Sequence, residues 1–497
     1  MNIQEAKEQV RRACIAYLTK DEFGDYIVPT ETQRPVFLLG APGVGKTAIV
    51  AQVARELGIG LVDYSMTHHT RQSAIGLPII EKRTFGGKEC SVSEYTMSEI
   101  IASVYEDIET NGNTEGILFL DEINCVSETL APAMLRFLQS KVFGGHKVPD
   151  GWVVVCAGNP SEYNKSARTF DIATLDRLKR VEIEPDYQAW RSWAATQGTH
   201  PTVMSFLDLR PDCFYQVETK GKTQHFVTAR AWSDLSTMMR LYDHHGLTID
   251  ESLVSHYIQL PSVAKEFSTY YALFANYEEK FRIKDILLGN IDEELTNVAK
   301  AANFDERASL VSLLVDSMTA NAESAVLEQR ALRFVRPILE NVLKQDADTA
   351  DKSDILKREC ENIEEDLHKN ALYYRSDHHA RFVRNRALAI LKDIAAKISL
   401  AEKTADECII SEFDSLLSTQ DGKLEQASSA MNSGITFLAQ TYGKENELVL
   451  CLSAITANPI LADVIAEYGC DAYFANQELI MMDVRRTKLK KRLNELM

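Results

Sequence analysis

The chain has 497 residues, of which 45% are apolar. At roughly 100 to 200 residues per domain, this length predicts two to four globular domains that can bury ample core without disulfides. Its 54 Lys and Arg residues against 72 Asp and Glu give a net charge of −18, which argues against general coating of nucleic acid or anionic lipid.

The amino-terminal stretch and the cysteines predict a soluble cytoplasmic protein. The first residues are charged from Glu5 onward and include no apolar signal-peptide core. No run approaches the roughly 18 apolar residues that span a bilayer, so we expect no membrane span. The nine cysteines are scattered and form no C-x-x-C pair, which is typical of free thiols in a reducing compartment.

Short apolar runs in the first part of the chain predict a parallel β-sheet. Continuous apolar runs separated by helical patterns are typical of strands that are covered on both faces. Apolar residues at helical spacing over 49–57 predict a helix directly after the first run. The expected strands are 35–40, 61–65, 117–121, 152–157 and 180–184.

The second half of the sequence predicts helices. From about 200 to 290 the pattern is helical around a polar hairpin-like stretch at 215–227, and beyond 290 there is little but helix. No apolar stripe persists for the three to four heptads of a long coiled coil. The stripes cover 327–342, 356–371 and 383–398, and breaks are expected at 346–354 and 417–426.

A phosphate-binding pattern, G-x-x-x-x-G-K-[ST], lies between the first expected strand and its helix. Glycines let backbone N–H groups turn toward a phosphate, and the helix N-terminus adds partial positive charge. Lys46 is expected to reach the β and γ oxygens, and the Thr47 hydroxyl to ligate Mg²⁺. The pattern comprises Gly40, Ala41, Pro42, Gly43, Val44, Gly45, Lys46 and Thr47.

Two further strand ends complete the expected nucleotide site. Asp121 and Glu122 follow an apolar strand, where Asp121 is expected to hold Mg²⁺ through water and Glu122 to act as general base. Asn159 follows the next strand and can orient water toward the γ-phosphate. Taken alone, the acidic pair also fits a solvated loop start, and Asn159 fits an Asn-Pro turn.

The order of these motifs, with TLDRL at 174–178 and FVTARAW at 226–232, resembles the AAA+ ATPases and specifically the MoxR family. The resemblance covers about residues 1–285. It implies Walker A at 40–47, Walker B at Asp121 and Glu122, and sensor 1 at Asn159. Members of the family are hexameric and chaperone-like, and commonly act with a partner that bears a von Willebrand factor A domain.

The resemblance also implies roles for two arginines. Arg177 resembles the arginine finger, which completes the neighbouring subunit's site, with Arg168 and Arg180 as competing candidates. Arg230 resembles sensor 2, which touches the γ-phosphate from the helical lid. Many relatives have Pro before that arginine, whereas this chain has Ala229. Without the motif context, each arginine would fit a surface ion pair.

Two insertions have hairpin signals. The stretch 67–96 resembles the helix-2 insertion of this clade, and 141–149 resembles the pre-sensor-1 hairpin. In the family both project toward the ring pore, where they meet clients. Plain surface hairpins are the alternative.

Other motifs favour structural readings. Adjacent histidines do not share a helix face, so we expect no metal at the doublets. The basic end, 484–497, fits an amphipathic terminal helix, with a nucleic-acid or acidic-partner contact as the alternative. The doublets are His68/His69, His244/His245 and His378/His379.

Together these features predict an α/β AAA+ P-loop module followed by an all-α region. The expected domains are a nucleotide-binding subdomain at 1–195, a helical lid with sensor 2 at 196–290 and a helical accessory domain at 291–497. The expected function is Mg²⁺-dependent ATP hydrolysis by a ring that remodels or matures a protein client. A nucleic-acid motor or defence component is the first alternative, and a nucleotide-switched scaffold the second.

Overall fold

The computed structural model describes residues 1–68, 74, 76–143, 145–164, 166–220, 223–345, 349–400 and 404–480. The chain forms two compact units, each with its own core. Unit 1 consists of Met1–Trp190, Thr228–Arg230 and Lys369–Ser376; unit 2 consists of Arg191–Val227, Ala231–His368 and Asp377–Met497.

Unit 1 is built on a five-stranded parallel sheet with the strand order β2-β5-β8-β1-β9. All five expected strands are present, which confirms the predicted fold class. The sheet aligns the carboxyl ends of the central strands, because Leu120 of β5 is paired with Cys156 of β8 and Leu39 of β1 with Gly158. The strands are β1 (Val36–Gly40), β2 (Gly60–Ser65), β5 (Gly116–Asp121), β8 (Trp152–Gly158) and β9 (Lys179–Ile183).

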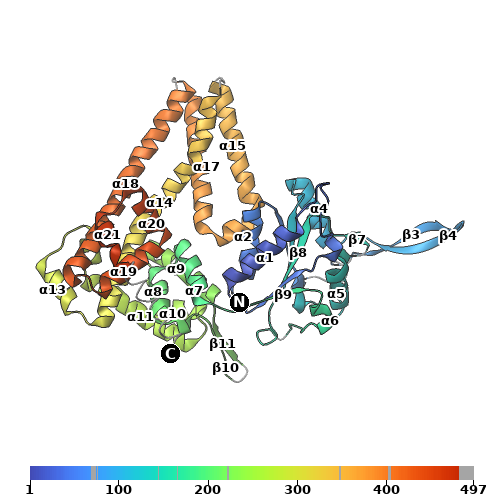
Figure 1. Cartoon of the computed structure of the whole chain (residues 1–497), viewed down its shortest axis with the longest axis horizontal. Helices are drawn as coiled ribbons and strands as arrows, with labels where there is room; N and C mark the ends of the chain where they lie inside the picture. The colour runs from blue at the N-terminus through green and yellow to red at the C-terminus, as the bar shows by residue number, and fades with distance from the viewer. Residues whose placement is uncertain are drawn as a thin grey trace. The chain divides into compact units, whose positions relative to one another are not determined.

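Helices cover both faces of this sheet (Figure 1). Alternate side chains of a strand point to opposite faces, so Phe119 packs with α1 and α2 whereas Leu118 and Leu120 pack with α4 and α5. This explains the continuous apolar runs in the sequence. The helices and short 3-10 turns of this part of unit 1 are α1 (Ile3–Tyr17), η1 (Thr30–Thr32), α2 (Lys46–Leu57), η2 (Met66–His68), α4 (Glu99–Asn111), η3 (Ile123–Cys125), α5 (Ala131–Ser140) and α6 (Ile172–Leu175).

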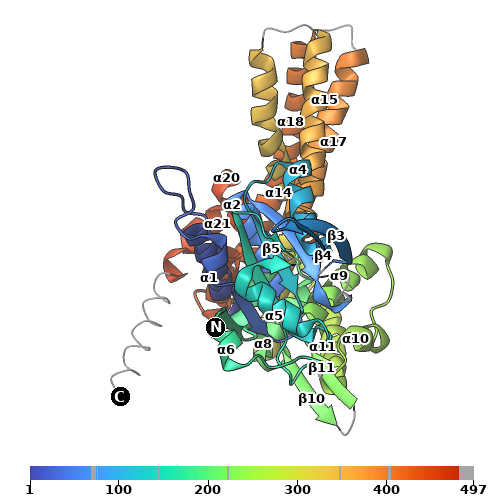
Figure 2. The same ribbon diagram turned by 90° about the vertical axis from the view of Figure 1, so that its right-hand side faces the viewer.

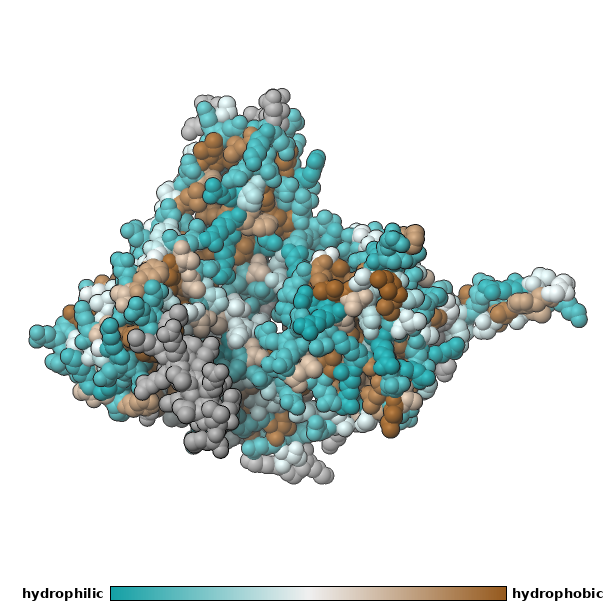
Figure 3. Space-filling view, viewed as in Figure 1, coloured by the Kyte–Doolittle hydropathy of each residue, from teal (hydrophilic) through white to brown (hydrophobic). Residues whose placement is uncertain are grey.

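Two antiparallel hairpins extend from unit 1, as the turn signals predicted. The longer one pairs β3 (Pro78–Phe85) with β4 (Lys88–Tyr95) around Gly86 and Gly87, which both have positive φ. Its strands are largely exposed and form a narrow arm (Figures 1 and 3). The shorter one pairs β6 (Val142–Phe143) with β7 (His146–Lys147).

Unit 1 also includes a segment from the distant helical region. Helix α16 (Ala371–Ser376) packs on α2, the helix that follows the phosphate-binding pattern. Arg55 Nη2 of α2 donates a hydrogen bond of 3.1 Å to the Tyr374 hydroxyl. The guanidinium also lies 5.9 Å from the ring centroid of Tyr373 and 5.6 Å from that of Tyr374.

The first part of unit 2 is helical around the expected hairpin, in which β10 (Gln216–Lys220) pairs with β11 (Thr223–Val227). Its aromatic core includes Phe206, Trp232 and Phe267, whose rings pack edge to face or tilted. The helices are α7 (Tyr187–Thr196), α8 (Pro201–Leu209), η4 (Pro211–Cys213), α9 (Ala229–His245), α10 (Glu251–Tyr257), α11 (Pro261–Lys280), α12 (Ile283–Leu287) and α13 (Glu293–Ala301); α7 and α9 begin in unit 1.

Four long helices run side by side in unit 2 (Figures 1 and 2). The expected break near 346–354 is present, because one helix ends at Lys344 and the next begins at Thr349. The stripe expected over 356–371 stops early, since Ala371 is exposed in α16. The long helices are α14 (Phe304–Lys344), α15 (Thr349–Lys369), α17 (His378–Leu400) and α18 (Ala405–Tyr442).

The expected break at 417–426 is wrong, because α18 is continuous through this stretch. The Gln420 side chain is buried and donates a hydrogen bond to the backbone carbonyl of Ala325 in α14, and Leu424 is 1% exposed. Packing on α14 therefore outweighs the low helix propensity of Gly422.

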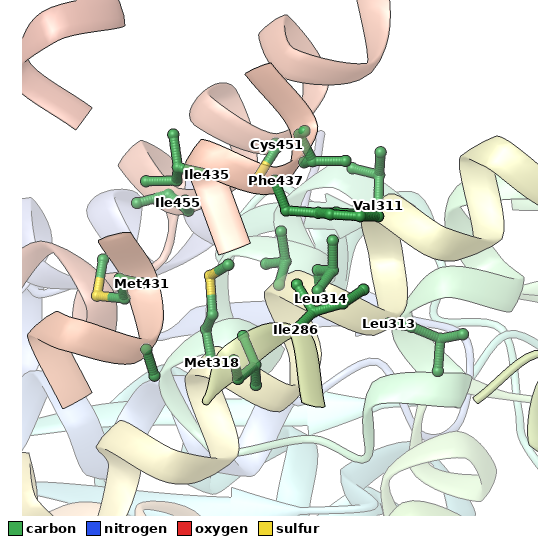
Figure 4. Packing of buried hydrophobic residues seen from close by; sticks show 14 of the residues in the cluster. Ile286, Val311, Leu313, Leu314, Met318, Met431, Ile435, Phe437, Cys451 and Ile455 are labelled. Atoms are coloured by element: carbon green, nitrogen blue, oxygen red, sulfur yellow. The ribbon is translucent and has the colours of Figure 1, made fainter. Parts of the chain in front are cut away.

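The N-terminal half of α14 and the C-terminal half of α18 pack together in the largest hydrophobic core of unit 2 (Figure 4). Met318 of α14 packs close to Gly434 of α18, where an added Cβ would overlap the Met318 methyl.

Within the described residues, no single helix is long and apolar enough to cross a membrane; α19 and α20 reach that length and hydropathy only jointly, across a bend of 89°. The closing helices are α19 (Asn446–Ala457), α20 (Pro459–Tyr468) and α21 (Asp471–Asn476).

Candidate active site

The phosphate-binding pattern forms a tight loop between β1 and α2. Gly43 and Gly45 have φ values of 76° and 100°, which residues with a Cβ rarely adopt. Helix α2 begins at Lys46, so the N–H groups of its first turn have no acceptor within the helix. The loop therefore offers backbone donors and a helix N-terminus to an anion.

Lys46 lies at the centre of the site and is only 8% exposed. Its Nζ donates hydrogen bonds to the carbonyls of Gly40 and Ala41, at 2.7 and 3.0 Å, and to Oδ1 of Asn159 at 2.9 Å. The pKa of Lys46 is lowered to about 8, mainly by burial; the Asp121 charge opposes this shift and the Arg230 charge adds to it. An incoming phosphate would replace lost hydration and stabilise the ammonium form.

Asp121 and Glu122 end β5 beside the loop. The Thr47 hydroxyl donates a hydrogen bond of 3.2 Å to Oδ2 of Asp121, and the Glu122 N–H donates one of 2.8 Å to Oδ1. Glu122 has a φ of 55°, in the left-handed region that non-glycine residues seldom occupy. Such backbone strain is often found at functional sites, and here it turns the chain sharply after the two carboxylates.

Asn159 follows β8 at the same sheet edge, as the parallel pairing predicted. The structure adds a residue that sequence reasoning missed, because Asn124 Nδ2 donates a hydrogen bond of 2.8 Å to the Asn159 carbonyl. Asn124 is 3% exposed. The only signal in the sequence is a polar residue within the otherwise apolar run after Glu122.

Arg230 lies at the start of α9 and adjoins the loop. A Cβ on Gly43 would come within 3.2 Å of the Arg230 Cβ and 3.1 Å of the Thr228 hydroxyl, so glycine permits this close approach. Helix α9 begins at Ala229, directly before this arginine. The Cβ of Arg230 therefore lies beside the phosphate-binding loop.

The three finger candidates differ in their contacts. Arg168 forms an ion pair of 3.0 Å with Glu128, and Arg180 pairs with Glu182. Arg177 is exposed and donates a hydrogen bond of 3.3 Å to the Ala173 carbonyl. Within the described part of the chain, none of its hydrogen bonds reaches the Lys46 site.

The residues present fit a nucleotide with Mg²⁺. The hydroxyl of Thr47 and the carboxylate of Asp121 are hard oxygen donors, which Mg²⁺ prefers, and they already lie 3.2 Å apart. The glycine loop and Lys46 supply the complementary donors for phosphate oxygens. Thus the structure brings together Lys46, Thr47, Asp121, Asn159 and the Arg230 stem.

Two of the histidine doublets, His244/His245 and His378/His379, belong to unit 2. His379 Nε2 lies 2.8 Å from Oε1 of Glu323, and the rings of His244 and His245 pack edge to face at 5.0 Å. Among the residues that the structure describes, no group of three or more His, Cys, Asp or Glu side chains is arranged to hold a metal ion. His69 and the basic end 484–497 lie outside the described residues.

Comparison with known families agrees with this geometry. Residues 36–181 match the model of the family described as ATPase family associated with various cellular activities (AAA). The matched region runs from β1 to β9 and includes the phosphate-binding loop, Asp121, Glu122, Asn159 and Arg177. No curated protein matches the chain.

Fold and match together define the class of protein: the chain carries an AAA+ ATPase domain. At this general level the domain implies nucleotide binding, typically with Mg²⁺, and ATP hydrolysis. Proteins of this class commonly form oligomeric rings.

Proposed function

We propose that the chain is a MoxR-type AAA+ ATPase, which forms a hexameric ring and hydrolyses ATP to remodel or mature a protein client in the cytoplasm. The observation that carries the proposal is the convergence at one sheet edge, where Lys46 binds Asn159 while Thr47 binds Asp121. The two bonds join the phosphate-binding loop to the ends of β8 and β5. ATP rather than GTP is chosen from the family resemblance.

In this proposal the side chains divide the chemistry. Lys46 and the loop N–H groups bind the phosphates, and Thr47 and Asp121 hold Mg²⁺, which supplies positive charge against the charge developing on phosphate oxygens. Glu122 accepts a proton from the attacking water, and Asn159 orients that water. Arg230 contacts the γ-phosphate from the start of α9.

The exposure of Arg177 is an argument for the proposed ring. Because it is exposed and its hydrogen bond stays within its own turn, its guanidinium is available to a neighbouring subunit. A finger supplied in trans stabilises transition-state charge and makes hydrolysis depend on assembly.

The two hairpins support the MoxR assignment and the client role. The β3–β4 arm presents Ile80 and Phe85 at 80% and 58% exposure, which provides apolar contact points for a polypeptide. A von Willebrand factor A domain protein is proposed as the partner, and the helical residues 291–497 as the region that recognises it.

Light scattering and affinity purification test this proposal. With ATP, the Glu122→Gln protein should form a species of about six subunits, and purification from its own host should recover a von Willebrand factor A domain protein and a client. A monomer under these conditions would contradict the ring. Recovery of nucleic acid in place of protein, with a salt-dependent gel shift, would favour the nucleic-acid motor instead.

A further inference from the structure

Asn124 occupies a buried junction between three segments of unit 1. It lies in η3, two residues after Glu122, and is 3% exposed. Its Nδ2 donates hydrogen bonds to the carbonyl of Asn159 at 2.8 Å and to that of Arg168 at 3.4 Å. The backbone carbonyl of Asn124 accepts a hydrogen bond of 2.8 Å from the backbone N–H of Arg168.

These hydrogen bonds are part of a closed network that connects the phosphate-binding loop, Asn159 and the turn after β5. Lys46 is bonded to the Asn159 side chain, and Asn124 to the Asn159 backbone. A single residue, Ile123, separates Asn124 from Glu122, and the Thr47 hydroxyl is bonded to Asp121. Both sides of Asn159 are therefore tied, one to the phosphate-binding loop and the other to the turn that carries Glu122.

The junction fits an asparagine closely. A Cβ on Gly158 would come 2.5 Å from Oδ1 and 2.9 Å from Cγ of Asn124, so the backbone before Asn159 lies against the amide. The amide NH₂ offers two donors to two backbone carbonyls, which a carboxylate cannot do. An aspartate would also place charge close to Asp121 and Glu122.

We propose that Asn124 is a positioning residue for hydrolysis, which holds the Asn159 backbone and the Glu122 turn in a fixed relation. The inference rests on the proposed ATPase function. Asn124 does not itself bind nucleotide in this account. Its loss should leave ATP binding to Lys46 and the loop intact but let the water-orienting amide drift from the general base, and a misplacement of about 1 Å can cost on the order of 10²-fold in rate.

The test compares Asn124→Ala and Asn124→Asp with a matched control, Gln33→Ala. Gln33 is also a buried amide, 5% exposed, and its Nε2 donates a hydrogen bond of 3.1 Å to the Val28 carbonyl in the loop before β1. Asn124→Asp keeps the size of the side chain but removes the donors. For each protein we would measure kcat and KM for ATP, the affinity for a fluorescent ATP analogue, the melting temperature and hydrogen exchange in peptides covering 158–164 without nucleotide.

Both Asn124 variants should lose about 10²-fold in kcat with KM and nucleotide affinity changed less than about threefold. Exchange over 158–164 should be faster, and Gln33→Ala should lower the melting temperature without this kcat loss. A kcat equal to that of wild type, or loss of folded protein in both Asn124 variants while Gln33→Ala stays folded, would overturn the positioning role. Absence of ATP hydrolysis in wild type would instead overturn the proposed function, and the inference with it.

Discussion

Lys46 Nζ and Asn159 Oδ1 lie 2.9 Å apart and join segments that are 113 residues apart in the chain. In the proposed mechanism, the bond links the group that binds phosphate to the group that orients water. It holds the phosphate-binding loop against the end of β8. Preorganised donors of this kind require little rearrangement when charge develops on the substrate.

The pKa of Lys46 predicts a pH dependence of nucleotide binding. Its value of about 8 means that the free protein loses this positive charge as pH rises through about 8, and phosphate binding favours the protonated form. ATP affinity should therefore be strongest below pH 8 and weaken above it, by at most about tenfold per pH unit for one proton. Titration with a fluorescent nucleotide between pH 6.5 and about 9.5 measures this. Lys46→Arg, which stays charged throughout, should show a flatter profile; identical profiles would exclude Lys46 as the titrating group.

Arg230 should contribute to both turnover and this pH midpoint. Arg230→Ala removes one donor to the γ-phosphate, and such a loss costs roughly 10² to 10³ in kcat. It also removes a charge that lowers the Lys46 pKa, so the midpoint of the binding profile should move to higher pH. Arg230→Lys retains the charge and should keep the midpoint. An equal midpoint of the binding profile in wild type, Arg230→Ala and Arg230→Lys would show that the Arg230 charge does not act on Lys46.

Arg177 should act on the neighbouring subunit. Arg177→Ala should keep ATP affinity and lose about 10³ to 10⁵ in turnover. When it is mixed with Lys46→Ala subunits, which carry an intact Arg177 but bind no ATP, part of the activity should return. Arg168→Ala and Arg180→Ala are the controls, because these arginines pair with Glu128 and Glu182 in their own chain. Rescue of one of them, with Arg177→Ala fully active, would move the finger to that residue.

Tyr374 should hold α16 on α2. The side chain is 3% exposed, so Tyr374→Ala should lower the free energy of unfolding by roughly 3 to 5 kcal/mol if α16 stays docked on α2. If α16 does not stay docked, it should detach locally from α2. Hydrogen exchange in the last turn of α2 should rise. Tyr374→Phe keeps the ring beside Arg55 and should cost only about 1 kcal/mol. Unchanged exchange in the Ala variant would show that this contact does not stabilise α2.

The sheet and the phosphate-binding loop could be predicted because local sequence determines them. Runs such as ILFLD must be buried on both faces, and glycines with positive φ are required at Gly43 and Gly45. Parallel pairing then places Asp121 and Asn159 at one edge. The role of Asn124 could not be predicted, because it depends on contacts with Asn159 and Arg168, which are 35 and 44 residues away.

The helical region shows the opposite case. The continuity of α18 depends on Gln420 and Leu424 packing in unit 2, so the polar, glycine-containing stretch misled a prediction based on local propensity. The docking of α16 on α2 also depends on long-range contact, since Arg55 and Tyr374 are 319 residues apart. Neither contact leaves a periodic pattern in the sequence.

The most direct test of the account is phosphate release by wild type and by Glu122→Gln, with nucleotide binding measured on the same samples. Glu122 is assigned to activate water and not to bind phosphate, so the variant should retain ATP affinity within a few fold while its turnover falls by about 10² or more. Lys46→Ala should instead lose binding. Normal turnover in Glu122→Gln would contradict the assignment of this site as the centre of ATP hydrolysis.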